Sequence, residues 1–492
     1  MLGFNFKEEQ MKKYILISCI IALFATSCSD DFLHTQPETS IPEQLAFSTP
    51  DKILAQTNNL YKQLQNQSFY GGRFIVFNEQ RADQFGQNDG NAATGSAVWN
   101  QNVASTNDFV NNVWSAGYTA INACNILISK LETTIVISNE LANNYIAEAK
   151  FIRALSYFSL VQTYAKPYNQ DKNALGLPLR LTPVTTSGNN DLARSSVEMV
   201  YFQILKDLDD AEAALPVSYA TPLLNTSRAK KCTAIALKTR VLLVQNDFEK
   251  VITESEKIVS ETFPFQYAEA GITQKLEPSF SAIFGGNYTG SEAIFSIIFA
   301  NSTTETPSAQ SSLAYNYLKQ PIIFLAASGI VSDPALGSNT DARAGLIGTS
   351  AANQKVLKKF SVTTAPFRDY VPVIRYSEIL LNYAEAAANM NDLQLATSLL
   401  NAVRNRANPN FVFADAEIAT KEALIITIQK ERDIEFLGEG LRLMDLQRKV
   451  QTLPAKQGAI GTAPLVLPTS SNYIWPIPSG EISVNRLIEP NN

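Results

Sequence analysis

The sequence predicts an all-α protein in which pairs of helices form a tetratricopeptide-like scaffold that carries long irregular loops. Apolar residues recur at helical spacing along most of the chain, and the stripes come in pairs joined by short polar turns. Segments rich in Gly, Asn, Ser and Thr separate these pairs, chiefly 86–108, 166–194, 262–291, 301–315 and 332–366. Because loops of this length are usually functional or disordered, we expect ligand binding to depend on them.

Local signals mark helix starts in the amino-terminal half of the chain. Thr49-Pro50-Asp51 offers an N-cap, a proline at the first helical position and an acid in the first turn. A long amphipathic helix is predicted over 140–165. Ser195 and Glu198 have capping-box spacing, which predicts a helix that runs to about Ala214.

Two helix–turn–helix units are predicted, at 228–260 and 375–407. In the second unit, apolar residues from Tyr376 to Ala387 follow the i, i+3, i+4, i+7 pattern of one helix face. A polar turn then breaks the stripe, and a second stripe follows. The first unit has the same layout, and each unit has about the length of a tetratricopeptide repeat, 34 residues.

The amino terminus has the features of a secretory leader. Lys12 and Lys13 precede an apolar run from Tyr14 to Phe24, which is shorter than the roughly 20 apolar residues that a spanning helix needs. We therefore expect Met11 to be the true start and residues 1–27 to be a signal peptide. No later segment is long and apolar enough to cross a membrane.

Cys28 follows the small residues Ala25-Thr26-Ser27, a pattern that resembles the lipobox of bacterial lipoproteins. We expect Cys28 to become the lipidated first residue, because two or more acyl chains anchor a protein stably. Ser29-Asp30-Asp31 is similar to the signal that sends some lipoproteins to the outer face of the outer membrane, so we expect a lipid-anchored protein that faces the cell exterior. The alternative is a plain secreted protein with an incidental cysteine.

Composition limits the partners and cofactors. Loss of residues 1–27 changes the formal charge only from −6 to −7, which gives no reason to expect a nucleic acid partner. The sequence has one histidine, His34, so zinc sites and catalytic triads that need histidine are not expected. No cofactor is predicted. Structural calcium stays an alternative, since residues 169–173 hold oxygen ligands without EF-hand spacing.

Only Cys124 and Cys232 remain to form a disulfide in the mature chain. Both lie in helical, apolar contexts, where a buried free thiol is the ordinary interpretation. Whether the two cysteines pair is left open by the sequence.

Ordered motifs over nearly the whole mature chain resemble the SusD/RagB family. The motifs are Arg81-Ala82-Asp83, Arg153–Tyr164, Gly176–Leu179, Arg375–Ala387, Leu400–Ala407, Glu431–Arg448 and Trp475–Asn485. The resemblance implies one unit over 28–492, with a SusD-like amino-terminal region at 28–260 and a RagB/SusD region at 261–492. Charges in the carboxyl-terminal motifs are expected to form salt bridges in the scaffold, and Trp114 and Trp475 are expected to be structural.

What the resemblance implies is a non-catalytic surface lipoprotein that captures a nutrient, usually a glycan. It would deliver that glycan to a partner SusC-like TonB-dependent transporter of the outer membrane. Capture of an oligopeptide is the alternative. A glycoside hydrolase would need two carboxyls about 5–9.5 Å apart across a cleft, and the acids that stand out lie in helical motifs.

Trp99 is the tryptophan in a polar, loop-like setting, between Asn91 and Asn102. An indole face supports the C–H surface of a sugar, while amides and guanidinium groups bind the hydroxyls. Trp99, Asn102 and Arg81 resemble the aromatic, Asn and Arg trio of the member for which the family is named. Further candidate ligand-binding residues are Asp83, Asn100 and Tyr288.

A second interpretation of Trp99 is a loop anchor buried against the scaffold. The family's larger aromatic platform would need a tryptophan between about 280 and 330, and this chain has none. That departure argues against starch-like helical ligands.

Overall fold

In this computed structural model the structure describes residues 43–186, 188, 190–284 and 288–491. The predicted leader, Cys28 and His34 lie outside these residues. The chain forms two units, 1–54 and 55–492, each described by itself. In the first unit the structure describes α2 (Glu43–Ala46) and the start of α3 (Pro50–Leu64), where Thr49 Oγ1 accepts a hydrogen bond from the Lys52 amide at 3.3 Å, as the predicted N-cap requires.

The second unit is mostly helical, which confirms the predicted fold class. Its longest helices are α6 (Asp108–Leu131), α7 (Asn139–Tyr164), α8 (Val197–Ala214), α10 (Lys231–Val244), α14 (Tyr376–Asn389), α15 (Leu393–Ala407) and α17 (Lys421–Glu435). The shorter ones are α4 (Arg73–Arg81), α5 (Ser96–Trp99), α9 (Pro222–Ser227), α11 (Phe248–Glu256), α12 (Phe280–Phe284), α13 (Pro334–Gly337), α16 (Asp415–Ile418), α18 (Arg442–Arg448) and α19 (Ser479–Val484). Among described residues, no helix is long and apolar enough to cross a membrane.

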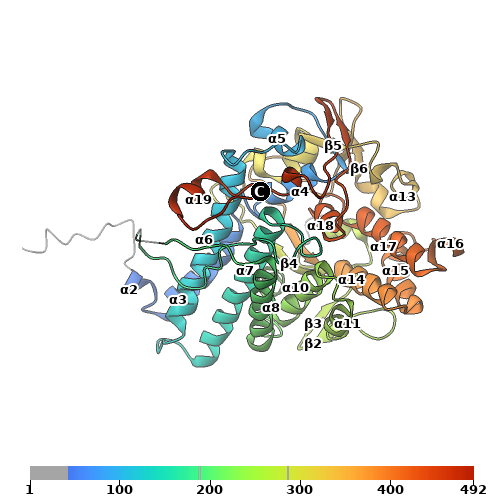
Figure 1. The fold of residues 1–492 in the computed structure, drawn as a ribbon. Helices are drawn as coiled ribbons and strands as arrows, with labels where there is room; N and C mark the ends of the chain where they lie inside the picture. Colours follow the sequence, from blue (N-terminus) through green and yellow to red (C-terminus); the bar gives the residue numbers. More distant parts are fainter. Residues whose placement is uncertain (1–42, 187, 189, 285–287, 492) are drawn as a thin grey trace, which may run out of the picture. The chain divides into compact units, whose positions relative to one another are not determined.

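Helices α6, α7, α8 and α10 pack side by side in sequence order (Figure 1). Helix α7 lies between α6 and α8, and its Phe151 and Leu155 are fully buried. Arg153 on α7 donates two hydrogen bonds to Asp207 on α8, at 2.7 and 2.8 Å, and one to Asn125 on α6 at 2.8 Å. A charge in a predicted motif thus ties three helices together inside the scaffold.

The start of α8 differs from the prediction by one residue. Ser196 is the N-cap, and its Oγ accepts a hydrogen bond from the Met199 amide at 3.2 Å. Glu198 is therefore not the partner of a capping box with Ser195. It binds the Lys172 ammonium at 2.7 Å on the surface.

The two predicted helix–turn–helix units are present as α10–α11 and α14–α15. Their turns are alike: Asn246 and Asn391 adopt left-handed backbone conformations, with φ of 58° and 65°. The next residue, Asp247 or Asp392, caps the second helix with its side chain. Helix α11 packs against α14, so the two units stack directly, as tetratricopeptide-like repeats do.

Buried ion pairs join the carboxyl-terminal motifs. Arg375 binds Glu292, Glu435 and Glu439 at 2.5, 2.9 and 2.8 Å, and each of these four side chains is at most 4% exposed. A second cluster joins Arg448 to Glu385 and Asp445 and joins Arg432 to Asp445. The predicted structural role of the motif charges is confirmed.

The segments between the helices form short antiparallel strand pairs that were not predicted, two of them within the predicted loops 262–291 and 332–366. The pairs are β1 (Phe85–Gln87) with β5 (Ile323–Leu325), β2 (Tyr267–Glu269) with β3 (Ile272–Gln274), β4 (Ala293–Ile297) with β8 (Val371–Arg375), β6 (Ile347–Thr349) with β7 (Lys355–Leu357), and β9 (Lys456–Gly458) with β10 (Gly461–Ala463). Phe85 pairs with Leu325 in the first of them. Segments distant in sequence therefore pair in the first and third of these sheets.

Candidate functional site

Trp99 is buried, which corrects the expectation that its indole faces solvent. The residue is 0% exposed and ends the single-turn helix α5, and its Nε1 donates a hydrogen bond to the Phe85 carbonyl at 2.8 Å. The Lys456 ammonium lies 5.6 Å from the ring centroid, and the absence of a side chain at Gly458 lets the ring approach that backbone closely. The structure thus matches the second interpretation, a loop anchor.

Arg81 is buried and Asp83 is half-buried, and both are bound to other parts of the protein. Arg81 is 2% exposed and donates a hydrogen bond to the Tyr473 carbonyl at 2.7 Å. Asp83 forms an ion pair with Arg442 at 2.7 Å. Burial alone would raise the pKa of Asp83, but the hydrogen bonds and charge of Arg442 outweigh it and hold that pKa below its ordinary value. Neither side chain is free to bind a ligand.

The remaining candidates do not join these residues in one surface. Asn102 is exposed after α5, whereas Asn100 is half-buried and serves as the C-cap of that helix. Tyr288 lies elsewhere: its ring stacks on Tyr370 at 4.4 Å, and its hydroxyl donates to Asp369 at 2.6 Å. Asn102 is thus the predicted residue that presents an exposed side chain in the loop of Trp99.

A cavity of about 560 Å³ lies over the same loop and is called the loop cavity here. Asn88 connects its walls, because its Nδ2 donates to the Pro321 carbonyl at 2.7 Å and to Gln354 Oε1 at 2.9 Å. Three loops that are far apart in the sequence therefore form one hollow. Its lining residues are Asn88, Asp89, Asn91, Thr94, Gln310, Tyr315, Leu318, Lys319, Gln320, Pro321, Ile322, Ser350, Ala351, Ala352 and Gln354.

The loop cavity is lined mostly by neutral polar side chains and one aromatic ring. Tyr315 is half-buried, begins a turn of π-helix, and contacts Phe367 edge-on at 6.2 Å. Asn, Gln and Thr side chains both donate and accept hydrogen bonds, as sugar hydroxyls do. Sequence reasoning missed Tyr315, which ends a predicted loop; the available signal was an aromatic residue in a polar segment.

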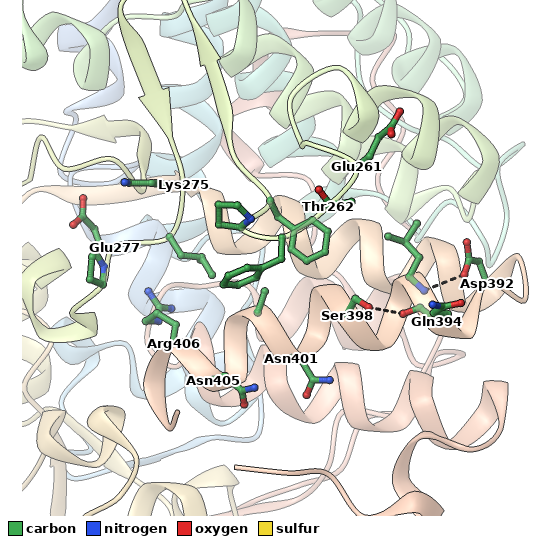
Figure 2. Close-up of a pocket in the computed structure, with 17 residues that line it drawn as sticks. Glu261, Thr262, Lys275, Glu277, Asp392, Gln394, Ser398, Asn401, Asn405 and Arg406 are labelled. Atoms are coloured by element: carbon green, nitrogen blue, oxygen red, sulfur yellow. Dashed lines mark hydrogen bonds between the residues drawn. The ribbon is translucent and has the colours of Figure 1, made fainter. Parts of the chain in front are cut away.

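A second cavity, of about 700 Å³, lies between α15 and two segments, 261–265 and 275–278, in and next to the predicted loop 262–291. We call it the helix cavity. Figure 2 shows Ser398, Asn401 and Asn405 in a row along α15, with Glu261 and Thr262 on the segment opposite. The helix cavity shares no residue with the loop cavity, and none of the predicted site residues lines it.

Cys124 and Cys232 are both free and buried, so the open question of a disulfide is answered by two separate thiols. Burial raises the pKa of both thiols. Within the described ranges, no group of three His, Cys, Asp or Glu residues is close enough to hold a metal ion. In the segment 169–173, Asp171 Oδ1 accepts hydrogen bonds from the Asn173 and Ala174 amides, as in an ordinary turn.

Comparisons with known proteins agree with this architecture. Residues 349–492 match the family described as "SusD family", and residues 31–243 match the family described as "Starch-binding associating with outer membrane". SusD-like protein P2 of Formosa agariphila is 23% identical, over 98% of this chain and 99% of its own.

Solved structures of SusD superfamily proteins have a similar fold. The crystal structure of a SusD superfamily protein from Bacteroides fragilis is 32% identical and superposes with a TM-score of 0.79, over 90% of this chain and 99% of its own. A laminarin-binding SusD-like protein, 21% identical, shares the fold with a TM-score of 0.70, over 90% of this chain and 99% of its own. The chain belongs to the SusD superfamily.

Proposed function

We propose that this protein captures a glycan at the cell surface and delivers it to a TonB-dependent transporter of the outer membrane. The loop cavity is the proposed capture site. The observation that carries the proposal is its lining, in which the half-buried ring of Tyr315 lies among neutral amide and hydroxyl side chains. Stacking on Tyr315 would hold the C–H face of a sugar while the amides bind its hydroxyls.

Membership of the SusD superfamily supports the same role. The family matched by residues 31–243 is described as starch-binding and as associating with the outer membrane, and this region contains the loop from Asn88 to Thr94. The proposed anchor is the lipidated Cys28, and the proposed activity is binding without catalysis. Asn102 stays a candidate contact because its side chain is exposed at the edge of the same loop.

Binding of defined sugars tests this function. Calorimetric titration of the purified protein with hexasaccharides of α-1,4-glucan, β-1,3-glucan, β-1,4-xylan and β-1,4-mannan is expected to give binding to at least one. Tyr315→Ala is expected to weaken that binding about tenfold through loss of stacking. Tyr168→Ala is the matched control, because Tyr168 is equally half-buried, contacts one aromatic neighbour and lines neither cavity.

Unchanged sugar binding in Tyr315→Ala would remove the loop cavity from the proposal. Absence of binding to every hexasaccharide, with binding to a tetra-alanine peptide, would favour the oligopeptide alternative. Urea denaturation is the control for folding. Equal midpoints for Tyr315→Ala and Tyr168→Ala would show that a change in sugar binding does not come from unfolding of the variant.

A further inference from the structure

We propose that the helix cavity is a second binding site for a neutral sugar, separate from the loop cavity. This goes beyond the proposed capture site, since a second site on the repeat scaffold would allow one glycan chain, or two, to be held at two points. Figure 1 shows α15, β2 and β3 apart from α5 and β5, which flank the loop cavity.

One wall of the helix cavity is a polar face of α15. Gln394, Ser398, Asn401 and Asn405 follow one another at i, i+4, i+7 and i+11, which places them on one face of the helix. Figure 2 shows the row. Ser398 Oγ donates to the Gln394 carbonyl at 2.9 Å, so its lone pairs stay able to accept.

The amides in this wall are not used by the protein. Among the described residues, the side chains of Gln394, Asn401 and Asn405 make no hydrogen bond, and Asn405 Oδ1 is buried without a partner. A buried polar atom left without a partner costs about 1–3 kcal/mol. An amide that both donates and accepts suits a ligand whose groups do the same, as hydroxyls do.

The opposite wall presents apolar side chains among polar ones. Phe263 is 76% exposed, and its ring lies 6.3 Å from that of the buried Phe265 in an edge-to-face arrangement. Pro264 and Leu276 extend this wall. A large exposed phenyl ring at the mouth of a cavity offers a flat face for the C–H surface of a pyranose.

The charges around the cavity favour a neutral ligand. Arg406 is already neutralised by ion pairs with Glu292 and Glu435, both at 2.6 Å. Lys275 and Glu261, of opposite sign, are both exposed on the lining segments. Glu277 and Asp392 also line the cavity, and both carboxylates already accept hydrogen bonds, Glu277 from Ser291 Oγ at 2.8 Å and Asp392 from the Leu395 amide at 3.0 Å. The side chains that the protein leaves unused on α15 are therefore uncharged amides, and apolar side chains lie on the segments opposite them.

A sugar fits this arrangement better than an extended peptide does. Proteins commonly hold extended peptides by backbone hydrogen bonds to a strand edge. The lining residues come from a helix and from two segments outside the strands, 261–265 and 275–278. A pyranose needs only one apolar face and hydroxyl partners at its rim, and the cavity provides both.

The test uses the full protein and removes the two sites separately. The probes are the four hexasaccharides named above and tetra-alanine, measured by saturation-transfer NMR and calorimetry. The variants are Tyr315→Ala, and Tyr315→Ala combined with Phe263→Ala, Asn401→Ala or Phe202→Ala. Phe202 is the matched control because it is also an exposed phenylalanine, 60% exposed, on α8.

We expect at least one hexasaccharide to bind the Tyr315→Ala protein. In that background, Phe263→Ala should weaken binding about tenfold, Asn401→Ala should weaken it several-fold, and Phe202→Ala should leave it unchanged. Truncation of the exposed Phe263 ring leaves no internal cavity, so these variants are expected to fold.

Three results would overturn the second site. One is that no hexasaccharide binds the Tyr315→Ala protein. Another is that Phe263→Ala and Phe202→Ala have equal effects. The third is that tetra-alanine, and no sugar, loses binding with Phe263→Ala, which would reassign the cavity to peptides. Because Tyr315→Ala alone reports on the loop cavity, failure of the capture proposal and failure of the second site give different patterns.

Discussion

The helical scaffold and the loop cavity use polar residues in opposite ways. In the scaffold, Arg375 is 2% exposed and lies among three buried glutamates. In the loop cavity, the polar residues are mostly neutral, and Asn91 and Gln320 are exposed. Burying a charge requires partners at fixed positions, so the scaffold has strict local motifs, whereas the proposed sugar-binding wall needs only donors and acceptors. The conspicuous charged motifs of this chain are therefore structural.

The aromatic residues show the same contrast. Trp99 stands out in the sequence and is 0% exposed, while the inconspicuous Tyr315 and Phe263 present their rings to the two cavities. Trp114 and Trp475, at 3% and 2% exposed, are structural as predicted. Four variants test this difference between the scaffold and the loops.

The largest effect is expected from Arg375→Ala. It would leave Glu292, Glu435 and Glu439 buried without their shared arginine, and breaking a buried pair costs about 3–5 kcal/mol, so we expect about 5 kcal/mol of lost stability. Urea denaturation measures the loss. Arg368→Ala is the control, because Arg368 is exposed and donates a hydrogen bond to the Asn301 side chain at 3.2 Å, with no part in the buried cluster. Equal midpoints for the two variants would contradict the structural role.

Trp99→Ala should destabilise the protein by about 3 kcal/mol, as other large core truncations do. The cause is the cavity left at a fully buried ring together with loss of its hydrogen bond to the Phe85 carbonyl. Trp99→Phe keeps most of the volume and should cost less. If Trp99→Ala kept full stability and lost only sugar affinity, the indole would face a ligand after all.

Glu79 on α4 contacts the loop before α18, and its ionisation should make the stability of the protein depend on pH. Burial raises its pKa to about 8, although the Gly440 amide donates to Oε1, and Oε2 is buried without a partner. The protonated form is favoured in the folded protein, so its stabilising contribution is full below pH 4.5 and is lost as pH rises through about 8. The slope is at most about 1.4 kcal/mol per pH unit.

Glu79→Gln should flatten that slope, since glutamine does not ionise. Urea denaturation of both proteins at pH 5.5 and pH 7.5 measures the change, and the variant should gain relative stability at the higher pH. A wild-type protein that became more stable between these two values, with the same rise in the variant, would contradict the assignment.

The smallest expected loss of stability comes from the N-cap of α8, and it distinguishes Ser196 from its neighbour Ser195. Ser196→Ala removes the N-cap of α8 and should cost about 1 kcal/mol, whereas Ser195→Ala should cost little. Thermal denaturation of the pair measures the difference. The reverse order would restore the predicted capping box with Glu198.

Local sequence patterns were enough to predict the helices that begin at Pro50, Asn139 and Val197 and the two helix pairs of the repeats with their turns. These features depend on residues within a few positions of each other, such as the left-handed Asn391 and the capping Asp392. Periodicity and cap chemistry are local, so they can be read along the chain. The one-residue error at Ser195 arose because two adjacent serines offer the same cap.

Which side chains are exposed at the two cavities depends on long-range packing, which local patterns do not reveal. Trp99 is buried because Lys456 and the backbone of Gly458, more than three hundred positions away, cover its ring. The loop cavity exists because three distant loops meet at Asn88, and the helix cavity because the segment around Phe263 lies opposite α15. Exposure is a property of contacts between remote segments, and no local pattern in this chain encodes it.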